Sequence, residues 1–181
     1  MLTRKAMLLD YDEFESPIGR ILFASDGEGI CALDYSGYES RMENLLTRRF
    51  GGFEFRRGFD PYQLTRRLRS YFDGELHALD GMPVSMGGTE FQGRVWKALR
   101  EIPAGRTQTY GELAARLGRA TAARAVGHAN GLNPVAIIVP CHRVIGASSA
   151  LTGYAGGLAR KEWLLRHEKS QGTLERIPYT G

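Results

Sequence analysis

Residues 133–144 read NPVAIIVPCHRV, an apolar run that ends at a proline and is followed at once by a cysteine and a histidine. A continuous β-branched run such as Val135 to Val139 predicts a strand that is covered on both faces. A reactive side chain at the end of such a strand is held rigidly and can still meet a substrate. Cys141 is therefore a candidate nucleophile.

A cysteine reacts as its thiolate, which needs a nearby positive charge, a base or a helix N-terminus. His142 and Arg143 are the obvious candidates. Neighbouring residues of an extended segment point to opposite sides, so a direct bond from His142 to Cys141 would need a sharp turn or a bridging water. We therefore expect a relay in which a carboxylate farther along the chain orients the imidazole. A buried, inert cysteine is the alternative, and residues 140–143 alone leave both open.

The second half of the chain contains six short motifs in a fixed order. They are Tyr110-Gly111-Glu112-Leu113, Ala123-Arg124-Ala125-Val126-Gly127, Asn133-Pro134, Pro140-Cys141-His142-Arg143-Val144, Gly153-Tyr154-Ala155-Gly156-Gly157 and Lys161-Glu162-Trp163-Leu164-Leu165-Arg166-His167-Glu168. Their order and spacing closely resemble those of the O6-alkylguanine-DNA alkyltransferases, in particular the bacterial constitutive type. The resemblance is dense over residues 88–169 and looser before them, so it does not depend on one short motif.

The resemblance implies a role in the reaction for five residues. Cys141 would accept the alkyl group, His142 would take its proton through a water, and Glu168 would orient His142. Asn133 would brace the turn that holds the cysteine, and Tyr110 would donate toward the departing guanine. The implied function is DNA repair by direct damage reversal, with O6-alkylguanine as substrate. Whether O4-alkylthymine is repaired as well stays open.

The chemistry is consistent with those roles. The O6 oxygen of guanine is buried in the duplex, so the nucleotide must be flipped out before a thiolate can attack. Displacement at the alkyl carbon leaves a guanine anion, which proton donation and hydrogen bonds would stabilise. The product is a thioether without a good leaving group. We therefore expect a suicide methyltransferase in which Cys141 reacts once.

The resemblance also marks residues that would bind the substrate and the DNA. Tyr154 would form a wall of the pocket, and the backbone amide of Ala155 would meet the guanine oxygen. Arg124 would fill the gap that the flipped base leaves. The remaining expected contacts are Val144 and Gly156 in the pocket, and Thr109, Ala123, Ala125 and Gly127 on the DNA.

Residues 110–117 and 121–131 predict two short helices joined by a tight connection, the pattern of a helix-turn-helix. The second helix is rich in Ala and Gly, and its long side chains are Arg124, His128 and Asn130. A major-groove reader needs several long polar side chains, whereas small residues allow close approach of the backbone. We expect binding in the minor groove of double-stranded DNA with little sequence specificity. Packing of the small residues against a neighbouring helix is the alternative.

Three other functions compete with alkyl transfer. An alkyltransferase-like protein, which binds damage and lacks the cysteine, is disfavoured by Cys141. A Cys-His hydrolase would turn over repeatedly and would need an oxyanion hole. A conventional helix-turn-helix regulator is disfavoured because small side chains build little sequence preference.

Composition limits the class of protein. The chain has 181 residues, of which 43% are hydrophobic and 24% charged, as in ordinary globular proteins. Residues 90–170 contain twelve Lys or Arg and five Asp or Glu, which gives this part +7 and leaves −3 for the rest of a chain whose total is +4. This basic excess suits a polyanionic partner. We expect a monomer on DNA, with cooperative binding left open.

No apolar run is long enough to span a bilayer and the first residues do not form a signal peptide, so we expect a cytoplasmic protein without a membrane partner. Cys31 and Cys141 are far apart and are expected to be free thiols, Cys31 in the core. No Cys/His set has the spacing of a structural zinc site. We therefore expect no metal and no cofactor.

The predicted fold is α+β. Residues 1–87 would form a small N-terminal α/β domain with a mostly antiparallel sheet, which the resemblance implies is ribonuclease H-like. The elements expected there are strands Leu8–Phe14, Ile21–Ala24, Ile30–Tyr35 and Phe53–Arg56, a helix Ser40–Phe50 capped by Ser40 and Glu43, a helix from Asp60 to near Gly74, and a linker over 74–88.

Residues 88–170 would form a mainly helical domain that carries the helix-turn-helix. Thr89 and Gln92 have the spacing of a capping box at the start of its first helix, which Pro103 ends. A closing helix is expected over Leu158–Glu168. The tail, residues 171–181, has no periodicity and is expected to be loose.

Overall fold

The computed structural model describes residues 6–169 and 175–176. By their internal contacts these form two compact units. The first unit comprises the chain up to Gly87 together with Pro134–Ala136, and the second comprises Gly88–Asn133 and the chain from Ile137 onward.

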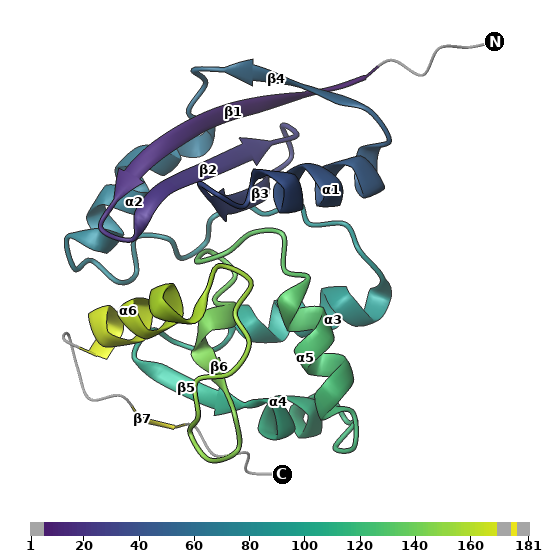
Figure 1. Cartoon of the computed structure of the whole chain (residues 1–181), viewed down its shortest axis with the longest axis vertical. Coiled ribbons are helices and arrows are strands. Elements are labelled where there is room, and N and C mark those ends of the chain that lie inside the picture. Colours follow the sequence, from purple (N-terminus) through teal and green to yellow (C-terminus); the bar gives the residue numbers. More distant parts are fainter. Residues whose placement is uncertain (1–5, 170–174, 177–181) are drawn as a thin grey trace. The chain divides into compact units, whose positions relative to one another are not determined.

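The first unit is built on a four-stranded sheet in the order β3-β2-β1-β4 (Figure 1). Its strands are β1 (Met7–Ser16), β2 (Gly19–Ser25), β3 (Ile30–Tyr35) and β4 (Phe53–Arg57). The pairs β1/β2 and β2/β3 are antiparallel hairpins, and β4 lies parallel to β1. The mostly antiparallel sheet is thus confirmed.

Two helices cover opposite faces of this sheet. Leu9 and Tyr11 of β1 pack in one cluster with Met42 and Leu46 of α1 (Glu39–Phe50). Residues of odd and even number in a strand point to opposite faces. Phe14 of β1 accordingly stacks on Phe72 of α2 (Leu64–Phe72) with ring centroids 6.0 Å apart. Cys31 lies in the α1 cluster, as expected for a core cysteine.

The start of α1 differs from the prediction. The helix begins at Glu39 and its N-cap is Tyr38, without a side-chain cap, so the capping box of Ser40 and Glu43 is wrong. The carboxylate of Glu39 instead accepts a hydrogen bond from the N–H of Gly37 at 2.8 Å. This bond lies in the turn that precedes the helix, and no side chain at the N-cap position caps the first turn of α1.

The start of α2 also lies later than expected. Pro61 opens a 3-10 turn (Pro61–Gln63), and Tyr62 and Gln63 have φ of 58° and 54°. These left-handed residues interrupt the helix, which begins at Leu64. Asp60 still serves the helix start, because its carboxylate accepts from the N–H of Thr65 at 3.1 Å.

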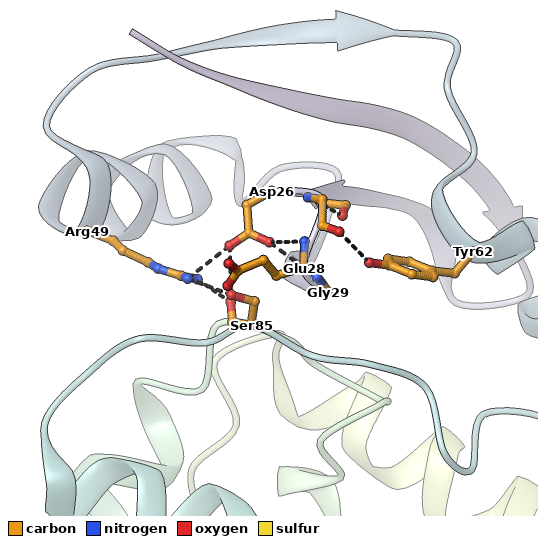
Figure 2. Close-up of polar contacts among 8 residues, drawn as sticks. Asp26, Glu28, Gly29, Arg49, Tyr62 and Ser85 are labelled. Atoms are coloured by element: carbon orange, nitrogen blue, oxygen red, sulfur yellow. Dashed lines mark hydrogen bonds and ion pairs between the residues drawn. The ribbon is translucent and has the colours of Figure 1, made fainter. Parts of the chain in front are cut away.

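Much of the expected linker packs against the first unit. The N–H of Ile30 donates to the carbonyl of Pro83, and the N–H of Ser85 donates to Ile30, both at 2.9 Å. Arg49 and Ser85 donate to the carboxylate of Asp26 at 2.9 and 2.7 Å (Figure 2). The chain is therefore held on the edge of β3 as far as Ser85.

The second unit combines helices with a small parallel sheet in the order β6-β5-β7. Thr89 and Gln92 form the predicted capping box at the start of the first helix, and Val95, Trp96 and Leu99 are buried along it. The elements are α3 (Glu90–Arg100), β5 (Arg106–Thr109), α4 (Tyr110–Arg116), α5 (Ala123–Gly131), a 3-10 turn (Cys141–Arg143), β6 (Val144–Ile145), α6 (Leu158–Lys169) and β7 (Glu175–Arg176).

Two sequence predictions bear on the ends of this unit. The closing helix is confirmed, since α6 covers the expected range. The tail was expected to be loose, but Glu175 and Arg176 pair with β5 as strand β7. The rest of the tail lies outside the described residues.

The strand predicted over Val135–Val139 is wrong. In the first unit Val135 makes a single bridge with Leu33 of β3, and the following residues form turns. Ile137 has a φ of 65°, which a β-branched residue rarely adopts. All five residues are nevertheless buried. The apolar run therefore predicted their burial correctly, but it predicted a strand where the backbone forms turns.

Gly29 is predicted to be required for the packing of the linker. A Cβ at this position would lie 2.7 Å from the carbonyl carbon of Val84, so Gly29→Ala should destabilise the protein by about 1–3 kcal/mol through overpacking. Gly52→Ala is the matched control, because no atom lies within 4 Å of its Cβ. Urea unfolding of both variants checks the prediction, and equal stability would contradict it.

Candidate functional site

Cys141 opens the 3-10 turn that leads directly into β6. Its N–H donates to the carbonyl of Val139 at 2.8 Å, and β6 is paired with β5. The cysteine is 5% exposed. A hydrogen-bonded turn therefore holds this side chain between a buried run and a strand.

The approach to the cysteine is braced by Asn133. Its side-chain Nδ2 donates to the carbonyl of Val139 at 2.8 Å, and Asn133 itself is buried. Between them Ile137 holds its left-handed φ, a conformation that costs on the order of 1–3 kcal/mol and persists only when the surroundings impose it. Asn133 thus lies where a brace for this turn is needed.

His142 is completely buried and is bound to Glu168. The two side chains meet at 2.8 Å between Nε2 of His142 and Oε1 of Glu168. Nδ1 of His142 meets no hydrogen-bond partner among the residues that the structure describes. An ionised carboxylate can only accept, so Nε2 carries the hydrogen and Nδ1 keeps a lone pair.

Arg143 completes this buried cluster. Its Nε and Nη2 donate to the two carboxylate oxygens of Glu168 at 3.0 and 2.9 Å, and Nη1 donates to the carbonyl of Ile102 at 2.6 Å. The sequence suggested Arg143 as a positive charge for the cysteine. The structure pairs it with Glu168 instead.

The surroundings lower the pKa values of both Glu168 and His142. Burial raises the pKa of Glu168, but the charges and hydrogen bonds of His142 and Arg143 outweigh burial and lower it. Burial lowers the pKa of His142, against the opposing effect of Glu168. At neutral pH the cluster therefore combines an ionised carboxylate, a permanent guanidinium cation and a neutral imidazole.

Lys161 is a buried site residue that the sequence reasoning missed. Its Nζ donates to the carbonyls of Val144, Thr152 and Gly153 at 2.5, 2.8 and 3.3 Å. Burial lowers the pKa of Lys161 to about 8, and the charge of Cys141 acts in the opposite direction. That coupling is mutual, so the ammonium group favours the thiolate form of Cys141.

A helical pattern contained a signal for Lys161. The buried residues of α6 are Lys161, Leu164, Leu165 and Glu168, which follow i, i+3, i+4, i+7 spacing. A lysine on the same stripe as the expected catalytic carboxylate is a polar residue at a core position. Such a residue requires a buried partner.

Tyr110 is the first residue of α4 and faces the loop before α6. Its hydroxyl donates to the carbonyl of Thr152 at 3.1 Å. Burial raises the pKa of Tyr110 and the charge of Cys141 acts in the same direction. The structure thus brings Tyr110, Lys161 and Cys141 into electrostatic contact although they are far apart in the chain.

The expected pocket residues lie on β6 and on the loop that follows it. Val144 is fully buried and its carbonyl is one of the acceptors of Lys161. Gly156 is buried and its carbonyl accepts from Arg160 at 2.9 Å. Tyr154 and Ala155 are partly buried.

The helix-turn-helix is formed by α4 and α5, which pack against each other. Arg124 and Ala125 are exposed near the start of α5, and Ala123 and Gly127 are partly buried. Thr109 is buried as the N-cap of α4, so its side chain is engaged within the protein.

One side of α5 is used for packing. A Cβ on Gly127 would lie 3.7 Å from the ring of Tyr110, and Val126 and Ala129 are buried. The packing alternative of the sequence analysis is therefore correct for this side. Arg124 remains exposed on the helix.

Two kinds of feature are absent from the described part of the chain. Within residues 6–169 and 175–176, no group of three or more His, Cys, Asp or Glu is arranged to hold a metal ion. In the same ranges no helix combines the length and apolarity that a membrane span requires.

Comparison with known proteins gives matches along most of the chain. The model of the 6-O-methylguanine DNA methyltransferase ribonuclease-like domain matches residues 9–86, and that of the corresponding DNA binding domain matches residues 90–170. The methylated-DNA--protein-cysteine methyltransferase of Salmonella typhimurium is 49% identical over 87% of this chain and 94% of its own length. A protein of the same name from Methanosarcina acetivorans is also 49% identical, over 88% and 98%.

A solved structure shares the fold. The crystal structure of Mycobacterium tuberculosis OGT in complex with DNA matches with a TM-score of 0.78 and 44% sequence identity. The match covers 91% of this chain and 95% of that one. The α+β fold expected from the sequence is confirmed.

Glu168→Gln is predicted to lower stability strongly at neutral pH. It leaves Arg143 buried without its counter-charge, which costs about 3–5 kcal/mol. Because the folded pKa of Glu168 is lowered, its stabilisation is present above its unfolded pKa and is lost as pH falls through the folded value. The variant should therefore lose less stability than the parent protein on acidification.

Glu162→Gln is the control on the same helix. Glu162 pairs with Arg166 at the surface, so its loss should cost no more than about 1 kcal/mol. Urea unfolding at neutral and acid pH measures both variants. Equal costs for Glu168→Gln and Glu162→Gln at neutral pH would contradict the prediction.

Proposed function

This chain belongs to the 6-O-methylguanine DNA methyltransferase family, and we propose on that basis that it repairs DNA by moving an alkyl group from O6-alkylguanine to its own Cys141. The observation that supports Cys141 as the acceptor is the buried cluster of His142, Glu168 and Arg143 directly beside it. A lone structural cysteine would not need a neutral imidazole and an ionised carboxylate at its side.

The first step is formation of the thiolate. The proton of the Cys141 thiol passes through a water to Nδ1 of His142, the nitrogen that carries the lone pair. Glu168 holds the opposite nitrogen and stabilises the imidazolium that forms. Lys161 stabilises the thiolate by its charge.

The second step is alkyl transfer. The sulfur of Cys141 attacks the alkyl carbon, a C–S bond forms, and the bond between that carbon and O6 breaks with its electrons leaving on guanine. Tyr110 donates its phenolic proton toward the guanine as the negative charge develops. The thioether product has no good leaving group, so each molecule acts once.

Access to the buried O6 atom requires that the nucleotide leave the stack. We assign Arg124, exposed on α5, to the space that the flipped base leaves. Close approach of the helix in the minor groove would involve its small residues, and little sequence specificity would follow. The DNA contacts of this proposal are Thr109, Ala123, Ala125 and Gly127 in addition to Arg124.

The proposal includes the remaining members of the site. Asn133 braces the turn before the cysteine, while Tyr154, Ala155, Val144 and Gly156 form the guanine pocket. We further propose that the protein acts in the cytoplasm as a monomer on double-stranded DNA. A protein that bound damaged DNA and left the alkyl group in place would instead be a damage-recognition protein.

Cys141→Ser is predicted to abolish alkyl transfer. After incubation with a duplex that contains one O6-methylguanine, the intact mass of the parent protein should rise by one methyl group and saturate at one per chain. Cys31→Ser is the control, because that thiol lies in the core of the first unit. Methylation of Cys141→Ser, or more than one methyl group removed per molecule, would contradict the mechanism.

Arg124→Ala is predicted to slow repair of a duplex by about tenfold or more while attack on the free alkylated base changes little, because only the duplex must be opened. Arg119→Ala is the control, since it removes an equal charge from the turn before α5. Single-turnover rates on both substrates measure the difference. Equal losses on duplex and free base would refute the assignment of Arg124.

A further inference from the structure

The outer edge of β3 binds the segment that leads to the acceptor cysteine. β3 is the outermost strand on one side of the sheet of the first unit. The N–H of Leu33 donates to the carbonyl of Pro134 at 2.9 Å, and the carbonyl of Leu33 accepts from the N–H of Ala136 at 3.1 Å. The N–H and the carbonyl of a strand residue point to the same edge, so neither group of Leu33 pairs with β2. A pair of backbone hydrogen bonds thus fixes residues 134–136 on the first unit.

A second pair of bonds of the same kind lies on this edge. The N–H of Ile30 donates to the carbonyl of Pro83, and the carbonyl of Ile30 accepts from the N–H of Ser85, both at 2.9 Å. Residues three apart in a regular strand face opposite edges, but the register of β3 against β2 shifts between Ile30 and Ala32. One extra residue in β3 therefore places Ile30 and Leu33 on the same edge.

The segment on β3 ends at a strained residue. Ile137 follows Ala136 directly and is the first residue of the second unit after this segment. Its φ of 65° is costly for a β-branched side chain, so its neighbours must impose it. On one side Ala136 is bound to β3. On the other side the carbonyl of Val139 accepts from Asn133 and from the N–H of Cys141, both at 2.8 Å.

We infer that Leu33 is a positioning residue for the acceptor cysteine, an inference that deepens the proposed function and rests on it. The backbone of Leu33 fixes the point from which the chain turns through Ile137 toward Cys141. Four residues lie between Ala136 and Cys141, so a shift of the bound segment is passed on to the turn that carries the thiol. A reacting group that is misplaced by about 1 Å can lose about 100-fold in rate.

This role gives the first unit a part in the reaction. The side chains assigned to alkyl transfer and to DNA all belong to the second unit, whereas Leu33 belongs to the first. Leu33 acts through the backbone of residues 134–136 and does not touch the substrate. Its loss should therefore lower the rate of transfer and leave the affinity for DNA unchanged.

The test compares two proline substitutions on the same edge. Leu33→Pro removes the N–H that binds Pro134, and Ile30→Pro, the matched control, removes the N–H that binds Pro83. Both N–H groups donate at 2.9 Å and both side chains are fully buried, so the two changes remove equivalent groups. Single-turnover methyl transfer is measured on a duplex with one O6-methylguanine and on the free alkylated base. Leu33→Pro should be slower than Ile30→Pro by about tenfold or more on both substrates.

Two measurements separate positioning from a general loss of structure. Leu33→Val keeps the N–H and should transfer at close to the parent rate, because the role belongs to the backbone. The affinity of Leu33→Pro for an undamaged duplex should equal that of Ile30→Pro, because Arg124 on α5 is present in both. A loss of folded protein would instead lower binding and transfer together.

A second pair of variants serves if proline prevents folding. Replacing the amide of Leu33 by an ester, through incorporation of leucic acid, removes the same N–H and keeps the side chain. The equivalent ester at Ile30 is its control. The ester at Leu33 should be the slower of the two by about two- to tenfold, the range that corresponds to one backbone hydrogen bond.

The outcomes separate this inference from the proposed function. Equal transfer rates of the Leu33 and Ile30 variants, or a parallel loss of DNA affinity and transfer in Leu33→Pro, would overturn the inference and leave alkyl transfer to Cys141 intact. A slow Leu33→Val variant would assign the effect to the side chain and would overturn it as well. No methyl transfer by the parent protein to the duplex would overturn both the inference and the proposed function.

Discussion

A single buried carboxylate, that of Glu168, orders the chemistry of the second unit. The guanidinium of Arg143 and the imidazole of His142 bind this carboxylate and lower the pKa of Glu168, while burial lowers the pKa of His142. The guanidinium is itself fixed by the carbonyl of Ile102. A buried ion pair is costly to break, so the 3-10 turn and α6 are held together at the point where the cysteine lies.

Helix α6 supplies two buried charges with different tasks. Glu168 sets the tautomer and orientation of His142 through a hydrogen bond. Lys161 donates hydrogen bonds to carbonyls of β6 and of the loop that follows it. The ammonium group also lies close enough to Cys141 for their charges to interact. One buried stripe of α6 thus contacts His142, lies near Cys141 and binds the loop whose Thr152 carbonyl accepts a hydrogen bond from Tyr110.

Helix α5 shows why small residues on a helix admit more than one interpretation. Gly127 allows the ring of Tyr110 to approach, and Asn130 reaches from the end of the same helix to the backbone of Cys141. Arg124 stays exposed. The buried residues Val126 and Ala129 pack within the protein, whereas Arg124 and Ala125 are exposed and available for the proposed DNA contact. Through Asn130, helix α5 and Cys141 are directly connected.

The sequence by itself determined the features that depend on neighbours in the chain. The hairpins followed from turn residues, the capping box of Thr89 and Gln92 from local spacing, and the family from the order of the motifs. Only the tertiary structure decided the form of residues 135–139, the partner of Arg143 and the burial of Lys161. An apolar run predicts that its residues are buried but does not determine whether their backbone forms a strand or turns. The partners of the buried charges lie far away in the sequence, so only the tertiary structure identifies them.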